Sequence, residues 1–167
     1  MSRSYRVRVA KDYTVFCSGH FVTYDRDQCE PLHGHNYRAA VSVEGDLDEN
    51  AYVFNFVPLK RFLRGICDSL DHRMLLPTDN PLIHIAADAT AYTVRVGHKT
   101  YVFPAEDVVQ LPIPNTTSEC LATWIGDQLV AELNSRSVPL AGLRAIEVEV
   151  EESFGQRAFC RRELSDG

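Results

Sequence analysis

The chain has 167 residues, of which 45% are hydrophobic and 24% are charged, and its formal net charge is −6 at pH 7. This composition is typical of a globular protein with one sizeable core, so we expect residues 1–167 to form a single domain. The acidic balance disfavours a general nucleic-acid-binding protein, and no stretch is long and apolar enough to cross a membrane.

The first predicted elements in chain order are strands. Alternating polar and apolar side chains predict strands over residues 5–17 and 36–46, joined by a loop that carries Cys29. From Pro58 onward the apolar spacing becomes helical, which predicts a helix over about residues 57–70. Its first turn accommodates the proline because an N–H at that point has no helical partner.

Residues 77–114 begin irregularly and then show two alternating runs around Gly97, which predicts an inserted β-hairpin. A second helix is expected to begin near Thr117 or Ser118. Two further strands follow it, over residues 143–154 and 157–164. The order β-β-α, insertion, α-β-β indicates an α+β fold with an antiparallel sheet.

The segment CEPLHGHNY, residues 29–37, carries two histidines at strand spacing. Strand parity places His33 and His35 on the same face as Tyr37 and the apolar residues that follow, so this face is expected to turn toward the core. Buried imidazoles are costly without a partner, and a metal ion removes that cost. His20, at the end of the first strand, is the third candidate ligand, and three histidines leave one position open, as catalytic zinc requires. The alternative is a set of hydrogen-bonded core histidines.

Cys29 lies four positions before His33 and has two interpretations. Near a dication its thiolate is a usable base or nucleophile, but the same sulfur is also a fourth ligand that makes the site structural. The chain has five scattered cysteines without a CxxC pair, which argues against a disulfide framework and favours a reducing cytoplasm.

Asp71 and His72 end the first predicted helix, where an aspartate can orient an imidazole. The alternative is a cation placed favourably at a helix C-terminus. Glu152 continues an apolar row on its strand, so its carboxylate points toward the core layer or a pocket, or else reaches water at the strand end. The other face of that strand, expected to be solvated, carries Glu147, Glu149 and Glu151.

Taken together, these motifs resemble the 6-pyruvoyl-tetrahydropterin synthase / 6-carboxytetrahydropterin synthase family. The matching pieces, in family order, are SGH (18–20), CEPLHGHNY (29–37), LK (59–60), SLDH (69–72), TSE (117–119) and EES (151–153). The three-residue gap between Cys29 and His33 is closest to the bacterial branch that serves queuosine biosynthesis.

The resemblance implies a tunnelling fold (T-fold), in which two helices cover one face of a four-stranded antiparallel sheet. It also implies a cytoplasmic homohexamer, a dimer of trimers, with active sites at subunit interfaces. Zn²⁺ would lie on His20, His33 and His35. Cys29 would be the catalytic base, and Asp71 and His72 would relay protons. The pterin substrate would be held by Glu152, Thr117, Ser118 and Glu119.

The activity implied by the resemblance is that of a zinc-dependent lyase. It converts 7,8-dihydroneopterin triphosphate to 6-carboxy-5,6,7,8-tetrahydropterin, with loss of triphosphate and acetaldehyde. The alternatives are the 6-pyruvoyl-forming reaction and a non-catalytic pterin- or purine-binding protein. The chain departs from the family pattern at Asn55, Leu76 and Cys120, where Asp, Asn and Asn are usual, and in its long segment 77–114.

Overall fold

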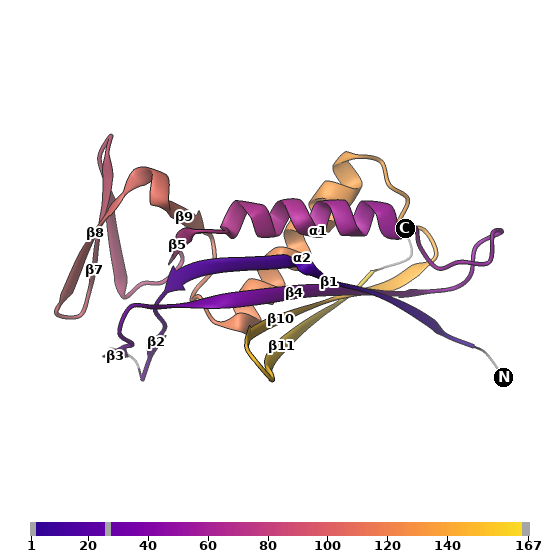
Figure 1. Ribbon diagram of the computed structural model, residues 1–167, viewed down its shortest axis with the longest axis horizontal. Coiled ribbons are helices and arrows are strands. Elements are labelled where there is room, and N and C mark those ends of the chain that lie inside the picture. Colours follow the sequence, from indigo (N-terminus) through magenta and orange to yellow (C-terminus); the bar gives the residue numbers. More distant parts are fainter. Residues whose placement is uncertain (1–2, 26–27, 165–167) are drawn as a thin grey trace.

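The computed structural model describes residues 3–25 and 28–164 (Figure 1). Within these residues the main sheet has six strands in the order β11-β10-β4-β1-β5-β9. Their bounds are β1 Tyr5–His20, β4 His33–Gly45, β5 Arg73–Pro77, β9 Val108–Leu111, β10 Leu143–Ser153 and β11 Gln156–Glu163. The four strands from β11 to β1 are antiparallel, as the alternating sequence patterns predict.

Two short strands correct the four-stranded prediction. Strand β5 pairs with β1 in parallel, and β9 pairs with β5 in parallel, so the sheet is mixed. Residues 74–77 of β5 are all buried. A short strand that is buried on both faces lacks the alternation from which strands are recognised.

Both helices lie on the same face of the main sheet (Figure 1). Helix α1 spans Phe56–Leu70 and is capped by Asn55, whose side chain accepts a hydrogen bond from the Val57 amide at 2.9 Å. Helix α2 spans Ser118–Ser135 and is capped by Thr117, as predicted. The apolar stripes of both helices pack on the inward row of the sheet and form the main core.

The inserted segment is a three-stranded sheet and not a lone hairpin. Its strands are β6 Ile83–Ala87, β7 Ala91–Val96 and β8 Lys99–Pro104, and β7 and β8 form the predicted hairpin around Gly97. A 3₁₀ helix, η1, follows at Ala105–Asp107. This sheet lies at one end of the main sheet (Figure 1) and builds a second apolar cluster with Phe21, Met74 and Leu76.

The loop between β1 and β4 forms a small ladder of its own, from β2 Thr23–Tyr24 and β3 Gln28–Cys29. On the sheet face away from the helices, the expected solvated row on β10 is partly wrong. Glu149 and Glu151 are each only 9% exposed, because Arg8 of β1 and Arg157 of β11 cover and neutralise them. Among the described residues, no helix is both long and apolar enough to span a bilayer.

Candidate functional site

The three predicted histidines come together where β1 ends and β4 begins. His20 and His33 are directly opposite each other in the antiparallel ladder, and His35 follows on the same strand. One ligand atom from each ring lies within 4.8 Å of the other two. His20 is fully buried, whereas His33 and His35 are more accessible, so the centre opens to solvent on one side.

Backbone carbonyls set the orientation of two of these rings. The Nδ1–H of His20 donates to the carbonyl of Thr116 at 3.0 Å, and that of His33 donates to Pro31 at 2.8 Å. A ring held in this way presents the lone pair of Nε2 to an ion, as metal-bound histidines do. Burial lowers the pKa of His20 to about 4, so its ring is neutral at physiological pH. The donor set therefore fits a zinc ion with an open position.

Glu152 points into this centre. Its Oε1 lies 3.6 Å from Nε2 of His20 and 3.6 Å from Nε2 of His35, and its side chain is 28% exposed. The hydroxyl of Tyr37, a buried residue below the histidines, lies 3.1 Å from Nε2 of His20. Burial raises the pKa of Tyr37, and so does Glu152, which keeps the hydroxyl protonated as a donor. Sequence parity placed Tyr37 on this face, but not its contact with His20.

A cavity of about 340 Å³ adjoins the triad and contains all four predicted substrate-binding residues. It is lined by Val22, Glu30, His33, Thr117, Ser118, Glu119, Glu152, Gln156, Arg157 and Ala158. Ser118 and Glu119 come from the first turn of α2, and Thr117 caps that helix. The Ser118 hydroxyl is buried without a hydrogen-bond partner in the described part of the chain, which makes it available to a ligand.

Glu30 is a functional candidate that the sequence reasoning missed. It lines this cavity, and its Oε2 lies 4.0 Å from Nε2 of His33. Cys29 is not among the lining residues. Its thiol donates to the Glu30 carbonyl at 3.3 Å, and its side chain packs against the second apolar cluster. Burial raises the pKa of the Cys29 thiol, and the nearby Lys99 opposes that effect. The only sequence signal for Glu30 is its position next to Cys29.

Just beyond α1, Nδ1 of His72 lies 2.9 Å from Oδ2 of Asp71. Asp71 accepts a hydrogen bond from the Cys17 amide at 2.7 Å, and this bond lowers the pKa of its carboxyl group. His72 is 83% exposed and lines another cavity, of about 500 Å³, whose wall also includes His33. Within one chain, His72 and Glu152 therefore line different cavities that share His33.

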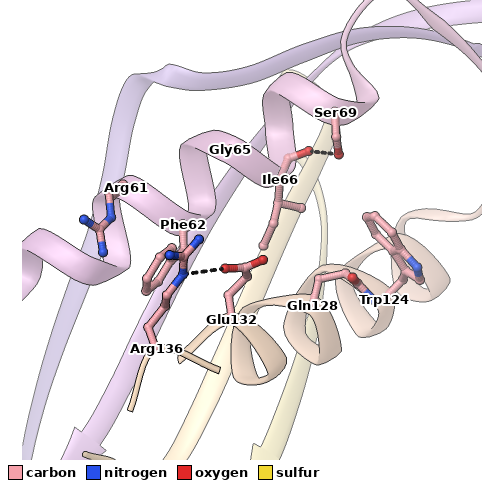
Figure 2. Close-up of a pocket in the computed structure, with 9 residues that line it drawn as sticks. All are labelled: Arg61, Phe62, Gly65, Ile66, Ser69, Trp124, Gln128, Glu132 and Arg136. Atoms are coloured by element: carbon pink, nitrogen blue, oxygen red, sulfur yellow. Dashed lines mark hydrogen bonds and ion pairs between the residues drawn. The ribbon is translucent and has the colours of Figure 1, made fainter. Parts of the chain in front are cut away.

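A further cavity, of about 490 Å³, lies between α1 and α2 (Figure 2). Its walls carry Phe62 and Trp124, together with an Arg136–Glu132 ion pair at 3.9 Å. None of the candidate catalytic, substrate-binding or metal-binding residues lines it. The candidate functional site is therefore the centre formed by the three histidines.

These features define the class of the protein. It is an α+β protein whose sheet carries two helices, and its candidate metal centre lies beside a polar pocket. More specifically, the chain belongs to the 6-pyruvoyl tetrahydropterin synthase family, whose model matches residues 8–163. The resemblance predicted from the sequence motifs is thereby confirmed.

Three similar proteins illustrate the range of this family. A protein of Methanocaldococcus jannaschii, provisionally named 6-carboxy-5,6,7,8-tetrahydropterin synthase, is 33% identical over 151 residues, which cover 89% of this chain and 90% of that protein. A Pyrococcus furiosus protein named dihydroneopterin monophosphate aldolase is 41% identical over 56 residues, 33% of this chain and 48% of that protein. The crystal structure of 6-pyruvoyl tetrahydropterin synthase from Plasmodium vivax matches with a TM-score of 0.90 at 28% identity, covering 98% of this chain and 100% of that one. Another structure of the P. vivax protein is a variant in which a glutamate described as a catalytic residue is replaced by alanine.

Proposed function

We propose that this chain is a zinc-dependent 6-carboxy-5,6,7,8-tetrahydropterin synthase. Its substrate is 7,8-dihydroneopterin triphosphate, and triphosphate and acetaldehyde are released with the product. The observation that carries the proposal is a cluster of three histidines, two of them oriented by backbone carbonyls, beside a cavity lined by His33, Glu152 and the N-terminal end of α2. The name of the M. jannaschii relative supports the same product.

The residues of the cavity suit a small heterocycle. The Glu152 carboxylate would accept hydrogen bonds from ring N–H groups, and the Ser118 hydroxyl, which lacks a partner, would supply a further polar contact. Bound zinc would polarise the hydroxyl groups of the substrate side chain. A positioned base, Cys29 or Glu30, would remove a proton from that side chain, with Asp71 and His72 relaying protons.

Substitutions separate the two candidate bases. If Cys29 is the base, Cys29→Ala lowers kcat by about 10²-fold or more, whereas Glu30→Gln changes kcat little. If Glu30 is the base, the two effects are exchanged. Glu30 is the better-placed group, because it lines the cavity and Cys29 does not. The catalytic glutamate of the P. vivax protein also favours it. The control is His84→Ala, which alters an exposed residue on β6.

A second candidate function is aldol cleavage of a dihydroneopterin phosphate. Two observations favour this candidate: Glu30 lines the cavity, and the P. furiosus relative is named an aldolase. Cleavage between the two hydroxyl-bearing carbons leaves the phosphate on a two-carbon aldehyde. Neither free triphosphate nor acetaldehyde is then released.

Product identification decides among these functions. The zinc-loaded protein is incubated with dihydroneopterin triphosphate, and the pterin, the aldehyde and free triphosphate are quantified. Acetaldehyde with triphosphate supports the carboxylate-forming reaction, and triphosphate without an aldehyde indicates the pyruvoyl-forming one. A phosphorylated aldehyde indicates aldol cleavage. Binding of a pterin without turnover would leave only the non-catalytic function.

We also propose that the chain assembles as a cytoplasmic homohexamer acting in queuosine biosynthesis. In such an assembly, Asp71 and His72 of one chain would face the histidines of another. Sedimentation equilibrium tests the oligomer, with an expected mass six times that of the 18.8-kDa chain. A monomeric mass at micromolar concentration would contradict it.

A further inference from the structure

Lys99, the first residue of β8, links the inserted sheet to the loop that carries both candidate bases. Its ammonium group donates to the carbonyl of Cys29 at 2.8 Å and to the carbonyl of Glu30 at 2.7 Å. The lysine is half-buried, and 70 and 69 positions separate it from these residues. Hydrogen bonds from an ionised donor are stronger than neutral ones, and two of the three ammonium donors are used here on adjacent peptide groups.

The opposite strand of the same small ladder is held by residues that flank the inserted sheet. The side-chain amide of Asn80 donates to the Thr23 hydroxyl at 2.8 Å, and the side-chain amide of Asn115 donates to the Thr23 backbone carbonyl at 2.9 Å. Across the ladder, the Glu30 amide donates to the carbonyl of Val22 at 2.9 Å. Both β2 and β3 are therefore fastened by hydrogen bonds that originate in the segment from Asn80 to Asn115.

Apolar packing reinforces these polar contacts. The Cys29 side chain packs on the second apolar cluster, which is formed largely by the inserted sheet. In that cluster the ring of Tyr101 on β8 stacks on Phe21, with the ring centroids 5.6 Å apart. Phe21 directly follows the candidate ligand His20. The inserted sheet thus contacts both the candidate-base loop and the neighbour of a candidate metal ligand.

We propose that Lys99 is a positioning residue, which fixes the Cys29–Glu30 peptide groups so that a candidate base is held at the histidine centre. The inserted sheet serves as the support from which Lys99 acts. This inference rests on the proposed function, since it concerns the placement of its base. Lys99 does not line the cavity and is not expected to touch the substrate.

The test compares three variants of the full-length, zinc-loaded protein. Lys99→Met removes the ammonium and keeps the length of the chain, and Lys99→Arg keeps a charged donor. Arg95→Met is the matched control, because it removes an exposed cation from β7 of the same sheet. The readouts are kcat and KM with dihydroneopterin triphosphate, bound zinc, and hydrogen exchange at the Glu30 amide, which reports directly on the ladder.

For Lys99→Met we expect kcat to fall by about 10–100-fold with KM within about twofold of the wild type. Displacing a catalytic group by about 1 Å has an effect of this order, whereas the groups expected to hold the pterin are untouched. Exchange at the Glu30 amide should become faster, bound zinc should be unchanged, and Lys99→Arg should restore most of kcat. Arg95→Met should match the wild type in every readout.

Two results would overturn the inference. One is a Lys99→Met protein whose kcat and Glu30 exchange equal those of Arg95→Met. The other is a general loss, in which zinc content falls and KM rises together with the fall in kcat, since that pattern indicates support of the fold alone. If the wild-type protein turns over no pterin phosphate, the proposed function fails. Exchange at Glu30 then decides by itself whether Lys99 holds the loop.

Discussion

Gly34 separates the two histidines of β4 and lies opposite Gly19 of β1 in the ladder. A Cβ on Gly34 would lie 3.0 Å from the carbonyl oxygen of Ser18, a tighter approach than ordinary side chains make. The absence of a side chain therefore lets β1 and β4 approach closely between the candidate ligands. This contact is a property of two strands and not of the His-Gly-His motif alone.

We predict that Gly34→Ala lowers zinc affinity by about tenfold, because pushing β1 from β4 alters the spacing of His20 and His33. Isothermal titration with Zn²⁺ measures this change. Gly65→Ala is the control, since a Cβ there meets nothing within 4 Å. In the interior of α1 that substitution should stabilise the protein by up to about 1 kcal/mol. Equal zinc affinities for the two variants would contradict the prediction.

The lowered pKa of Asp71 gives a second prediction at this scale. A carboxyl group whose pKa is lower in the folded state stabilises the fold above its ordinary pKa, and loses that effect as the pH falls through the folded value. Asp71→Asn should therefore lower the free energy of unfolding by up to about 1 kcal/mol at pH 7, a figure that allows for solvent screening of this partly exposed group, and by less at pH 3. Urea denaturation at both pH values measures the difference.

The control for this measurement is Asp12→Asn, at an exposed position of β1. Its effect should be small at both pH values. A destabilisation by Asp71→Asn that is as large near pH 3 as at pH 7 would show that the charge of Asp71 is not its cause.

At the scale of elements, helices and long strands were predictable because their periodicity is local. The apolar spacing after Pro58 places α1 within one residue of its observed start, and the alternation in residues 143–154 identifies β10. Strands β5 and β6 are among those that the sequence analysis missed, together with β9. The first is short and almost entirely buried, and the second is paired with a partner that only the folded insertion supplies.

The cap of α1 provides a prediction for this scale. Asn55 occupies a position where the family usually has Asp, and its side chain still accepts from the Val57 amide at 2.9 Å. Asn55→Ala should reduce the free energy of unfolding by about 1 kcal/mol, because the amide loses its acceptor. Asn55→Asp keeps an acceptor and should cost little. Equal losses in chemical denaturation would show that the cap does not stabilise α1.

At the scale of the molecule, the three histidines join β1 to β4, and a carbonyl next to α2 orients one of them. An ion bound there would connect elements that are distant in sequence, and it would bind the folded state alone. Zinc at 100 times its dissociation constant should therefore stabilise the fold by about 2.7 kcal/mol. Thermal unfolding with and without a chelator measures this effect.

The His35→Ala protein serves as the reference for that experiment. Its thermal midpoint should not respond to zinc or to the chelator. A midpoint that responds to zinc equally in the wild type and in His35→Ala would place the ion elsewhere on the chain.

The sequence by itself determined the helices, the antiparallel strands, the family and the three histidines, because strand parity and motif spacing are set by neighbouring residues. Only the tertiary structure decided that Glu30 lines the cavity, that arginines cover Glu149, and that Lys99 holds the peptide groups of a distant loop. These contacts join residues far apart in the chain. No local pattern encodes them, since they depend on how separate elements pack.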